Sequence, residues 1–134
     1  MGRIVTPVTI SSFTDPTKTI RCDALVDTGA SPMVLPSAWK DRLGPFPQSE
    51  EVTLDTAAQT QITGLMCGPV KVQVEGFRAI STEVLFLDMT PLDGQYEPLV
   101  GYLVLEALPV AVDLLGHRLV QVKSLDLKAA RFRR

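Results

Sequence analysis

Short segments in which apolar and polar residues alternate, separated by turn-forming residues, are the dominant pattern in this 134-residue chain. Arg3 to Ile10 alternates in this way, Ser11 to Lys18 supplies Ser, Asp and Pro for a turn, and Thr19 to Asp27 follows as a second such segment. Alternation with a period of two places the apolar side chains on one face of a strand. The sequence therefore predicts a β-hairpin at the start of the chain.

Further strand pairs and two short helices are expected along the rest of the chain. The strand pairs are Glu51 to Thr56 with Gln59 to Leu65, Cys67 to Val74 with Phe77 to Leu87, and Val110 to Asp113 with Arg118 to Val122. Helical turns are expected at Pro36 to Leu43 and at Tyr102 to Leu108, where Pro109 ends the helix, and Thr90 to Pro98 is turn-rich. We therefore predict an all-β fold, a closed or partly open β-barrel with one or two short helices.

Size, composition and charge indicate a globular domain. A chain of this length can bury about two thirds of its unfolded surface, and 46% apolar with 21% charged residues excludes intrinsic disorder. We expect one domain over residues 1–134, with a core at about 3–122 and a basic tail at about 128–134. The net charge of -2 gives no support for a nucleic-acid partner. The tail is interpreted as a solvated end, and the alternative is contact with an acidic partner or a membrane surface.

Histidine and cysteine counts exclude several kinds of site. The chain has one histidine, His117, so one chain cannot supply two imidazoles to a metal, and we expect no metal or other cofactor. Cys22 and Cys67 are far apart and are expected to be reduced thiols, with a disulfide between them as the open alternative. Because the sequence has no secretion signal and no apolar run of about 20 residues, we expect a cytoplasmic protein without a membrane span.

The candidate chemistry lies at the end of the second predicted strand. An apolar run, Ala24 to Val26, leads to Asp27, after which Thr28 and Gly29 turn the backbone sharply. Apolar neighbours raise the free energy of ionising a carboxylate, whereas a hydroxyl and backbone N–H groups orient it. An ordinary turn aspartate is the alternative, but the apolar run before the triplet, and Ala30-Ser31 with a second apolar run after it, favour a functional carboxylate.

This segment resembles the active-site motif of the aspartic proteases, and a short chain with one copy resembles their retropepsin branch of viral, bacterial and cellular proteins. Pro98 to Gly101, followed by the helix at Tyr102 to Leu108, is similar to the hydrophobic-hydrophobic-Gly motif that precedes the family's single helix. Val110 to Asp113 with its turn to Arg118-Leu119-Val120 is a weaker match. The matches cover Thr6 to Val122, in the order of the predicted strands.

The resemblance implies an aspartic endopeptidase that is active as a C2 homodimer. Asp27 from each subunit would form a pair in which one carboxylate acts as base towards a water and the other as acid towards the scissile carbonyl, without a metal or a covalent intermediate. Thr28 would lock the two loops across the two-fold axis, and Gly29 would permit close approach of the backbone to the pair. Gly101 would be the structural glycine before the helix.

The resemblance also implies a polypeptide substrate bound in extended conformation. A hairpin flap from Leu54 to Gly64 would close over it, although its tip lacks the glycines of the viral pattern and Gly64 would serve as the hinge. Asp55-Thr56 is followed by Ala57 instead of glycine, so we do not expect a second catalytic motif there. The expected substrate contacts are Ala30, Ser31, Ala57, Ala58, Gln59 and Thr60.

Two alternatives to an active enzyme remain open at this point. A catalytically silent peptide-binding or dimerisation module could keep the same fold, although the complete Asp27-Thr28-Gly29 triplet favours the enzyme. A protease-like domain of a ubiquitin-shuttle type protein would need flanking domains.

The two ends of the chain could take part in the dimer. Arg3 to Val8 and Gln121 to Leu127 could interleave in a dimer sheet, as in the viral relatives. His117 and Asp113 are interpreted as turn residues.

Overall fold

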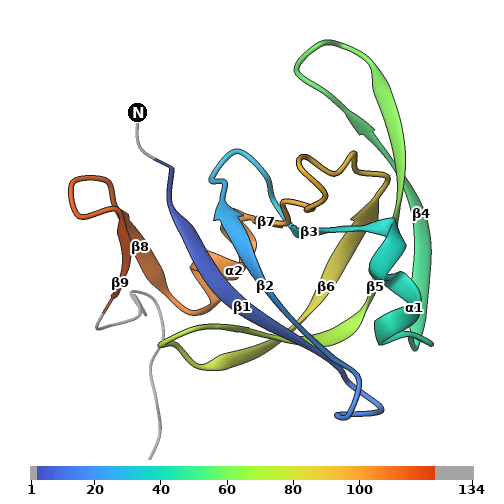
Figure 1. The fold of residues 1–134 in the computed structure, drawn as a ribbon, viewed down its shortest axis with the longest axis horizontal. Helices are drawn as coiled ribbons and strands as arrows, with labels where there is room; N and C mark the ends of the chain where they lie inside the picture. The colour runs from blue at the N-terminus through green and yellow to red at the C-terminus, as the bar shows by residue number, and fades with distance from the viewer. Residues whose placement is uncertain (1–2, 123–134) are drawn as a thin grey trace, which may run out of the picture.

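Residues 3–122, which are the part described by a computed structural model, form a strongly bent sheet and a separate hairpin (Figure 1). The bent sheet has seven strands: β1 (Val5–Ser12), β2 (Thr19–Val26), β3 (Met33–Pro36), β4 (Gln48–Asp55), β5 (Gln61–Val74), β6 (Ala79–Leu87) and β7 (Leu99–Val100). The hairpin consists of β8 (Val110–Asp113) and β9 (Arg118–Gln121). The helical segments are the 3₁₀ turn η1 (Ser37–Trp39), α1 (Lys40–Leu43) and α2 (Tyr102–Ala107). The all-β prediction with short helices is confirmed.

The sheet closes on itself because β1 pairs with strands on both of its sides. The strand order is β1-β2-β7-β3-β6-β5-β4, and β1 also pairs with β5. The register of this closing pair sets Val8 opposite Val74 and Ile10 opposite Val72, and all four side chains are buried. β4 lies outside the ring and extends it along the first half of β5. The expected partly open barrel is therefore present.

The interior of the barrel follows from period-two alternation. In β5, every second residue from Val70 to Val74 is fully buried, and Leu35 of β3 and Phe86 of β6 join the same cluster. Such a strand presents its polar residues to solvent between the buried ones. Burial of these branched and aromatic side chains is the main favourable term in the stability of the barrel.

β5 differs from the prediction. Two strands were expected, at Gln59 to Leu65 and at Cys67 to Val74, whereas the chain forms one strand of 14 residues. Its register with β6 shifts between Cys67 and Val70, around Gly68-Pro69. A proline and a glycine are tolerated inside a strand where such an irregularity removes a ladder hydrogen bond. The first half of β5 pairs with β4 and the second half with β1.

The structure also bears on the expectations for the two cysteines, for His117 and for a membrane span. Cys22, half-buried, and Cys67, buried, are both free, so the alternative of a disulfide between them is wrong. His117 is exposed in the turn between β8 and β9, as expected. Over residues 3–122, no helix is long and apolar enough to cross a membrane. The basic tail from Lys128 to Arg134 and most of the expected strand from Gln121 to Leu127 lie outside the described residues.

The burial of Leu35 and the exposure of Leu92 predict that replacement by alanine destabilises the fold far more at the first position than at the second. Leu35→Ala removes a side chain with no exposed surface and should lower the free energy of unfolding by about 2–5 kcal/mol, because it leaves a cavity. Leu92→Ala is the matched control, since Leu92 is 79% exposed, and its effect should stay within about 0.5 kcal/mol. Urea unfolding at one protein concentration measures both, and equal effects would contradict this account of the core.

Candidate active site

Asp27 lies directly after β2, where three stretches of backbone meet. β7 inserts between β2 and β3, parallel to β2 and antiparallel to β3. The Asp27 N–H donates to the carbonyl of Val100 at 2.9 Å, and the preceding Val26 N–H donates to the carbonyl of Ile4 at 2.8 Å. The start of the chain and β7 therefore hold the end of β2 from its two sides.

The Asp27 side chain is oriented by its own loop. Its Oδ1 accepts a hydrogen bond from the Gly29 N–H at 2.9 Å, and the Ala30 N–H donates to the Asp27 carbonyl at 3.2 Å. A Cβ at position 29 would stand 3.2 Å from that same Oδ1, so a larger residue there would crowd the carboxylate. Asp27 is half-buried, whereas Thr28 and Gly29 are exposed. The carboxylate is thus fixed by the backbone and still open to solvent.

The loop after Asp27 is attached to the start of α2. The Tyr102 N–H donates to the carbonyl of Ala30 at 2.8 Å, and the Leu103 N–H donates to the carbonyl of Ser31 at 3.0 Å. The first N–H groups of a helix have no partner within the helix, so the loop supplies acceptors that the helix needs. Ala30 and Ser31 are half-buried, and each uses its carbonyl in this contact rather than presenting it to a ligand.

Gly101 is buried between the loop and the helix. A Cβ at this position would lie 2.5 Å from the Ser31 carbonyl oxygen and 2.7 Å from that of Ala30, and it would also overlap the Pro32 carbonyl. The φ of Gly101 is -83°, which any residue adopts, so the position requires glycine for space and not for backbone freedom. The Asp27 loop can approach the helix this closely only because Gly101 has no side chain.

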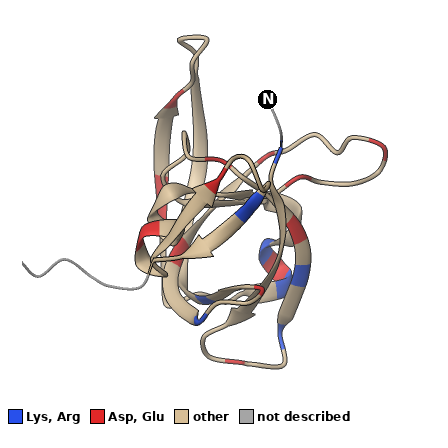
Figure 2. Cartoon of the chain, turned by 90° about the vertical axis from the view of Figure 1, so that its left-hand side faces the viewer, with Lys and Arg blue, Asp and Glu red and all other residues tan. Residues whose placement is uncertain are grey.

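The hairpin of β4 and β5 carries the remaining predicted contacts. It projects from the body at the same end of the molecule as the loop after β2, and it stands clear of the rest in a second view (Figure 1, Figure 2). Its turn is closed by hydrogen bonds from the Thr56 N–H to the Thr60 carbonyl at 2.8 Å and from the Gln59 N–H to the Thr56 carbonyl at 2.9 Å. Ala57, Ala58, Gln59 and Thr60 are all exposed.

Gly64, the expected hinge, is buried where the hairpin joins the barrel. A Cβ there would lie 2.9 Å from both Leu85 Cδ1 and the Phe86 carbonyl oxygen, so glycine allows β5 to pack closely on β6. β5 pairs with β6 from Leu65 onwards, and before that point it pairs with β4 alone. The free part of the hairpin therefore begins at Gly64.

A cavity of about 240 Å³ lies against Asp27 and Thr28. Arg3 and Leu25 form part of its wall, and Leu114 of the β8–β9 turn forms another part. The sequence placed Leu25 in the apolar run before Asp27 but gave no sign that Arg3 and Leu114 belong to the site, because these two residues lie on separate segments of the chain. Within residues 3–122, no cluster of three or more His, Cys, Asp and Glu residues could hold a metal ion.

Other titratable side chains near the site are poor alternatives to Asp27. Asp113, at the end of β8, accepts hydrogen bonds from the Gly116 N–H at 3.0 Å and from Arg118 Nε at 3.1 Å, and these bonds lower the pKa of its carboxyl. Burial, with a further effect from Asp23, raises the pKa of the Cys22 thiol to about 11. A thiol with so high a pKa is a poor nucleophile near neutral pH. Asp27, by contrast, is half-buried, lies against a cavity and is oriented by the Gly29 N–H.

Comparison with known proteins agrees with this geometry. A family model described as aspartyl protease matches residues 7–104. The chain belongs to the aspartyl protease family. The fold is similar to that of the EIAV protease in its complex with the inhibitor HBY-793, with a TM-score of 0.58, 23% sequence identity, and coverage of 90% of this chain and 94% of that chain. A search of curated proteins found no match. The predicted retropepsin-like fold is confirmed.

The space around Gly101 predicts a strong effect of one added methyl group. Gly101→Ala should destabilise the fold by about 1–3 kcal/mol or more, because three carbonyl oxygens must move to make room for the Cβ. Gly44→Ala is the matched control, since its φ of -76° is similar and its Cβ would lie 3.3 Å from the Phe46 ring. Thermal unfolding of both variants is the measurement, and equal stability would contradict the packing described for the loop.

The raised pKa of Cys22 predicts slow alkylation. At pH 8 the thiolate fraction should be far below that of a free cysteine, whose pKa is about 8.5, so iodoacetamide should modify Cys22 at least about tenfold more slowly than glutathione. The rate should rise as the pH approaches 11. Mass spectrometry of a Cys67→Ser variant isolates the signal of Cys22, and a rate equal to that of glutathione would show that the thiol is not buried as described.

Proposed function

We propose that the protein is an aspartic endopeptidase of the retropepsin type, active as a homodimer in which each subunit contributes Asp27. One observation carries the proposal: the Asp27 carboxylate is held by the Gly29 N–H and open to solvent, in a loop of a chain that belongs to the aspartyl protease family. Carboxylate-pair chemistry needs a second such group close by. The sequence has one Asp-Thr-Gly triplet, so the second group comes from a second copy of the chain.

The pair would work by sharing one proton. Two carboxylates held close together do not both ionise, so they titrate as a unit. The ionised carboxylate takes a proton from a water while the water oxygen attacks the scissile carbonyl carbon. The protonated carboxyl gives its proton to the carbonyl oxygen, which yields a tetrahedral diol. As the diol collapses and its C–N bond breaks, the leaving amine takes the proton held by the first carboxylate. The second carboxylate takes a proton back from a diol hydroxyl, which leaves a carboxylic acid product and restores the shared proton of the pair.

Other residues have positioning roles in this proposal. Thr28, exposed beside Asp27, would hydrogen-bond across the two-fold axis and keep the two loops in register. Ser31 would contact the substrate through its N–H group and its hydroxyl, since its carbonyl already binds α2. Ala30 would contact it through its side chain, since its N–H binds the Asp27 carbonyl and its own carbonyl binds α2. The tip of the β4–β5 hairpin, Ala57 to Thr60, would close over an extended peptide.

Replacement of Asp27 tests the carboxylate pair. Asp27→Asn should lower kcat for peptide cleavage by at least about a thousandfold while leaving the fold intact, because the amide cannot act as base. Asp41→Asn, an exposed carboxylate on α1, removes the same charge and should keep the activity. A statine-type inhibitor should abolish the cleavage that remains in Asp41→Asn. Equal cleavage by wild type and Asp27→Asn would refute the proposed mechanism.

Subunit mixing tests the shared site. The active species should have twice the chain mass of 14.6 kDa, and an excess of Asp27→Asn should suppress wild-type activity as mixed dimers form. The same excess of Asp41→Asn should not suppress it. A dimer that binds peptide without cleaving it would identify a silent peptide-binding module instead, and full activity of a strict monomer would overturn the proposed pair.

A further inference from the structure

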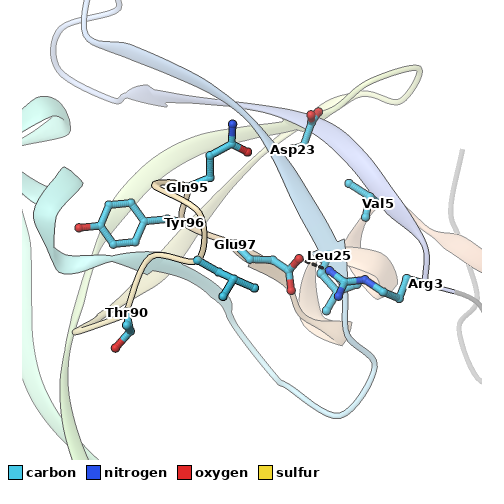
Figure 3. A pocket seen from close by; sticks show the side chains of 9 residues that line it. Arg3, Val5, Asp23, Leu25, Thr90, Gln95, Tyr96 and Glu97 are labelled. Atoms are coloured by element: carbon cyan, nitrogen blue, oxygen red, sulfur yellow. Dashed lines mark hydrogen bonds and ion pairs between the residues drawn. The ribbon is translucent and has the colours of Figure 1, made fainter.

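A second hollow, of about 470 Å³, lies on the face of β2 that carries Asp23 and Leu25 (Figure 3). It extends under the segment that joins β6 to β7, and we call it the β2 pocket. Val5 of β1 and Leu92, Gln95 and Glu97 of the connecting segment supply further parts of its lining. The neighbouring β2 residue, Ala24, faces the core instead. The pocket is therefore outside the barrel, on the surface of the sheet.

The β2 pocket adjoins the candidate active site. Asp23, Leu25 and Asp27 occupy alternate positions along one strand and its extension, so their side chains leave the backbone on the same side. Leu25 and Arg3 line both this pocket and the cavity against Asp27. Alternate residues of a strand are about 7 Å apart, which is also the distance between alternate side chains of an extended peptide. A substrate residue within a few positions of the scissile bond can therefore reach the pocket.

The pocket combines apolar walls with a carboxylate. Leu92 is 79% and Val5 is 51% exposed, and Leu25 lies between β1 and the connecting segment. These side chains offer apolar surface that a ligand could cover. Asp23 is exposed at the edge of the same hollow, near Gln95 (Figure 3).

The charges around the pocket leave Asp23 available. Arg3 forms an ion pair with Glu97 inside the pocket, so these two charges compensate each other (Figure 3). Arg21, on the same side of β2, pairs with Glu75 at 2.9 Å. Arg42, which lines a neighbouring hollow, stacks over the Trp39 ring at 5.6 Å. Among residues 3–122, Asp23 takes part in no ion pair, so its carboxylate leaves the pocket with a net negative charge.

We propose that the β2 pocket binds a Lys or Arg side chain of the substrate and that Asp23 determines this preference. A long cationic side chain places its methylene groups on apolar surface and its charged end near a carboxylate. In the pocket, Leu92 and Val5 provide the apolar surface and Asp23 provides the carboxylate. An acidic side chain would be repelled by Asp23, and a short apolar one would leave this carboxylate without a partner. The inference rests on the proposed peptidase function and adds a substrate class to it.

The expected size of the preference follows from the exposure of Asp23. Ion pairs at exposed positions are weak, so Lys should be favoured over an uncharged side chain of the same length by roughly 1.5- to fivefold. The preference should decrease at high salt, because ions screen exposed charges.

A peptide series tests the preference. One cleaved peptide is varied by placing Lys, norleucine or Glu at each position around the scissile bond, and kcat/KM is measured for each. Wild type should favour Lys over norleucine at one position, Asp23→Asn should reduce this ratio to about one, and Asp23→Lys should favour Glu. Asp93→Asn, an exposed carboxylate of the same connecting segment that does not line the pocket, is the control and should keep the wild-type ratio.

A binding measurement separates the pocket from the proposed activity. The same peptides are titrated against Asp27→Asn, with and without Asp23→Asn, and thermal unfolding checks that each variant is folded. Preferential binding of the Lys peptides that depends on Asp23, together with no cleavage by wild type, would support the pocket and reject the peptidase. Cleavage without a preference for Lys, or a preference that is unchanged in Asp23→Asn, would overturn the pocket and leave the peptidase in place.

Discussion

The hydrogen bond from the Asp27 N–H to the Val100 carbonyl is the contact on which the rest of the site depends. It continues the pairing of β2 with β7 past the end of the strand, and it joins two motifs that are far apart in the sequence. Because β7 leads directly into Gly101 and α2, the same short strand also brings the helix to the loop. A carboxylate, a strand and a helix are thereby fixed by one local arrangement of backbone.

Backbone groups, and not side chains, position the carboxylate, its loop and the helix in this arrangement. The carboxylate is oriented by an N–H, the loop carbonyls are bound by the first N–H groups of α2, and Gly101 contributes by lacking a side chain. Backbone geometry tolerates many side-chain changes on the surrounding surface. The neighbouring β2 pocket is the opposite case, because its character comes from the side chains of Asp23, Leu92 and Val5.

Local patterns were sufficient to predict the hairpins, the two helical turns and the Asp27 loop, since alternation, prolines and short motifs act over a few residues. They were not sufficient for β5, because the expected break at Met66 lies inside one continuous strand, and the irregularity in its pairing with β6 comes later, at Gly68-Pro69. They also could not predict the β2 pocket, because Asp23 and Leu92 meet only after the barrel has closed. The contribution of Arg3 to both hollows had no signal in the sequence, since one arginine near a chain end is common.

The continuity of β5 has a mechanical consequence. The strand begins as one arm of an unsupported ribbon and ends as a wall of the barrel, and the change happens at Gly64, where β6 begins to pair. A force applied to the turn at Thr56 to Thr60 is carried along the backbone to this point and then shared among several strands. Because Gly64 packs closely on Leu85 and Phe86, the ribbon and the packed interior are mechanically coupled at this residue.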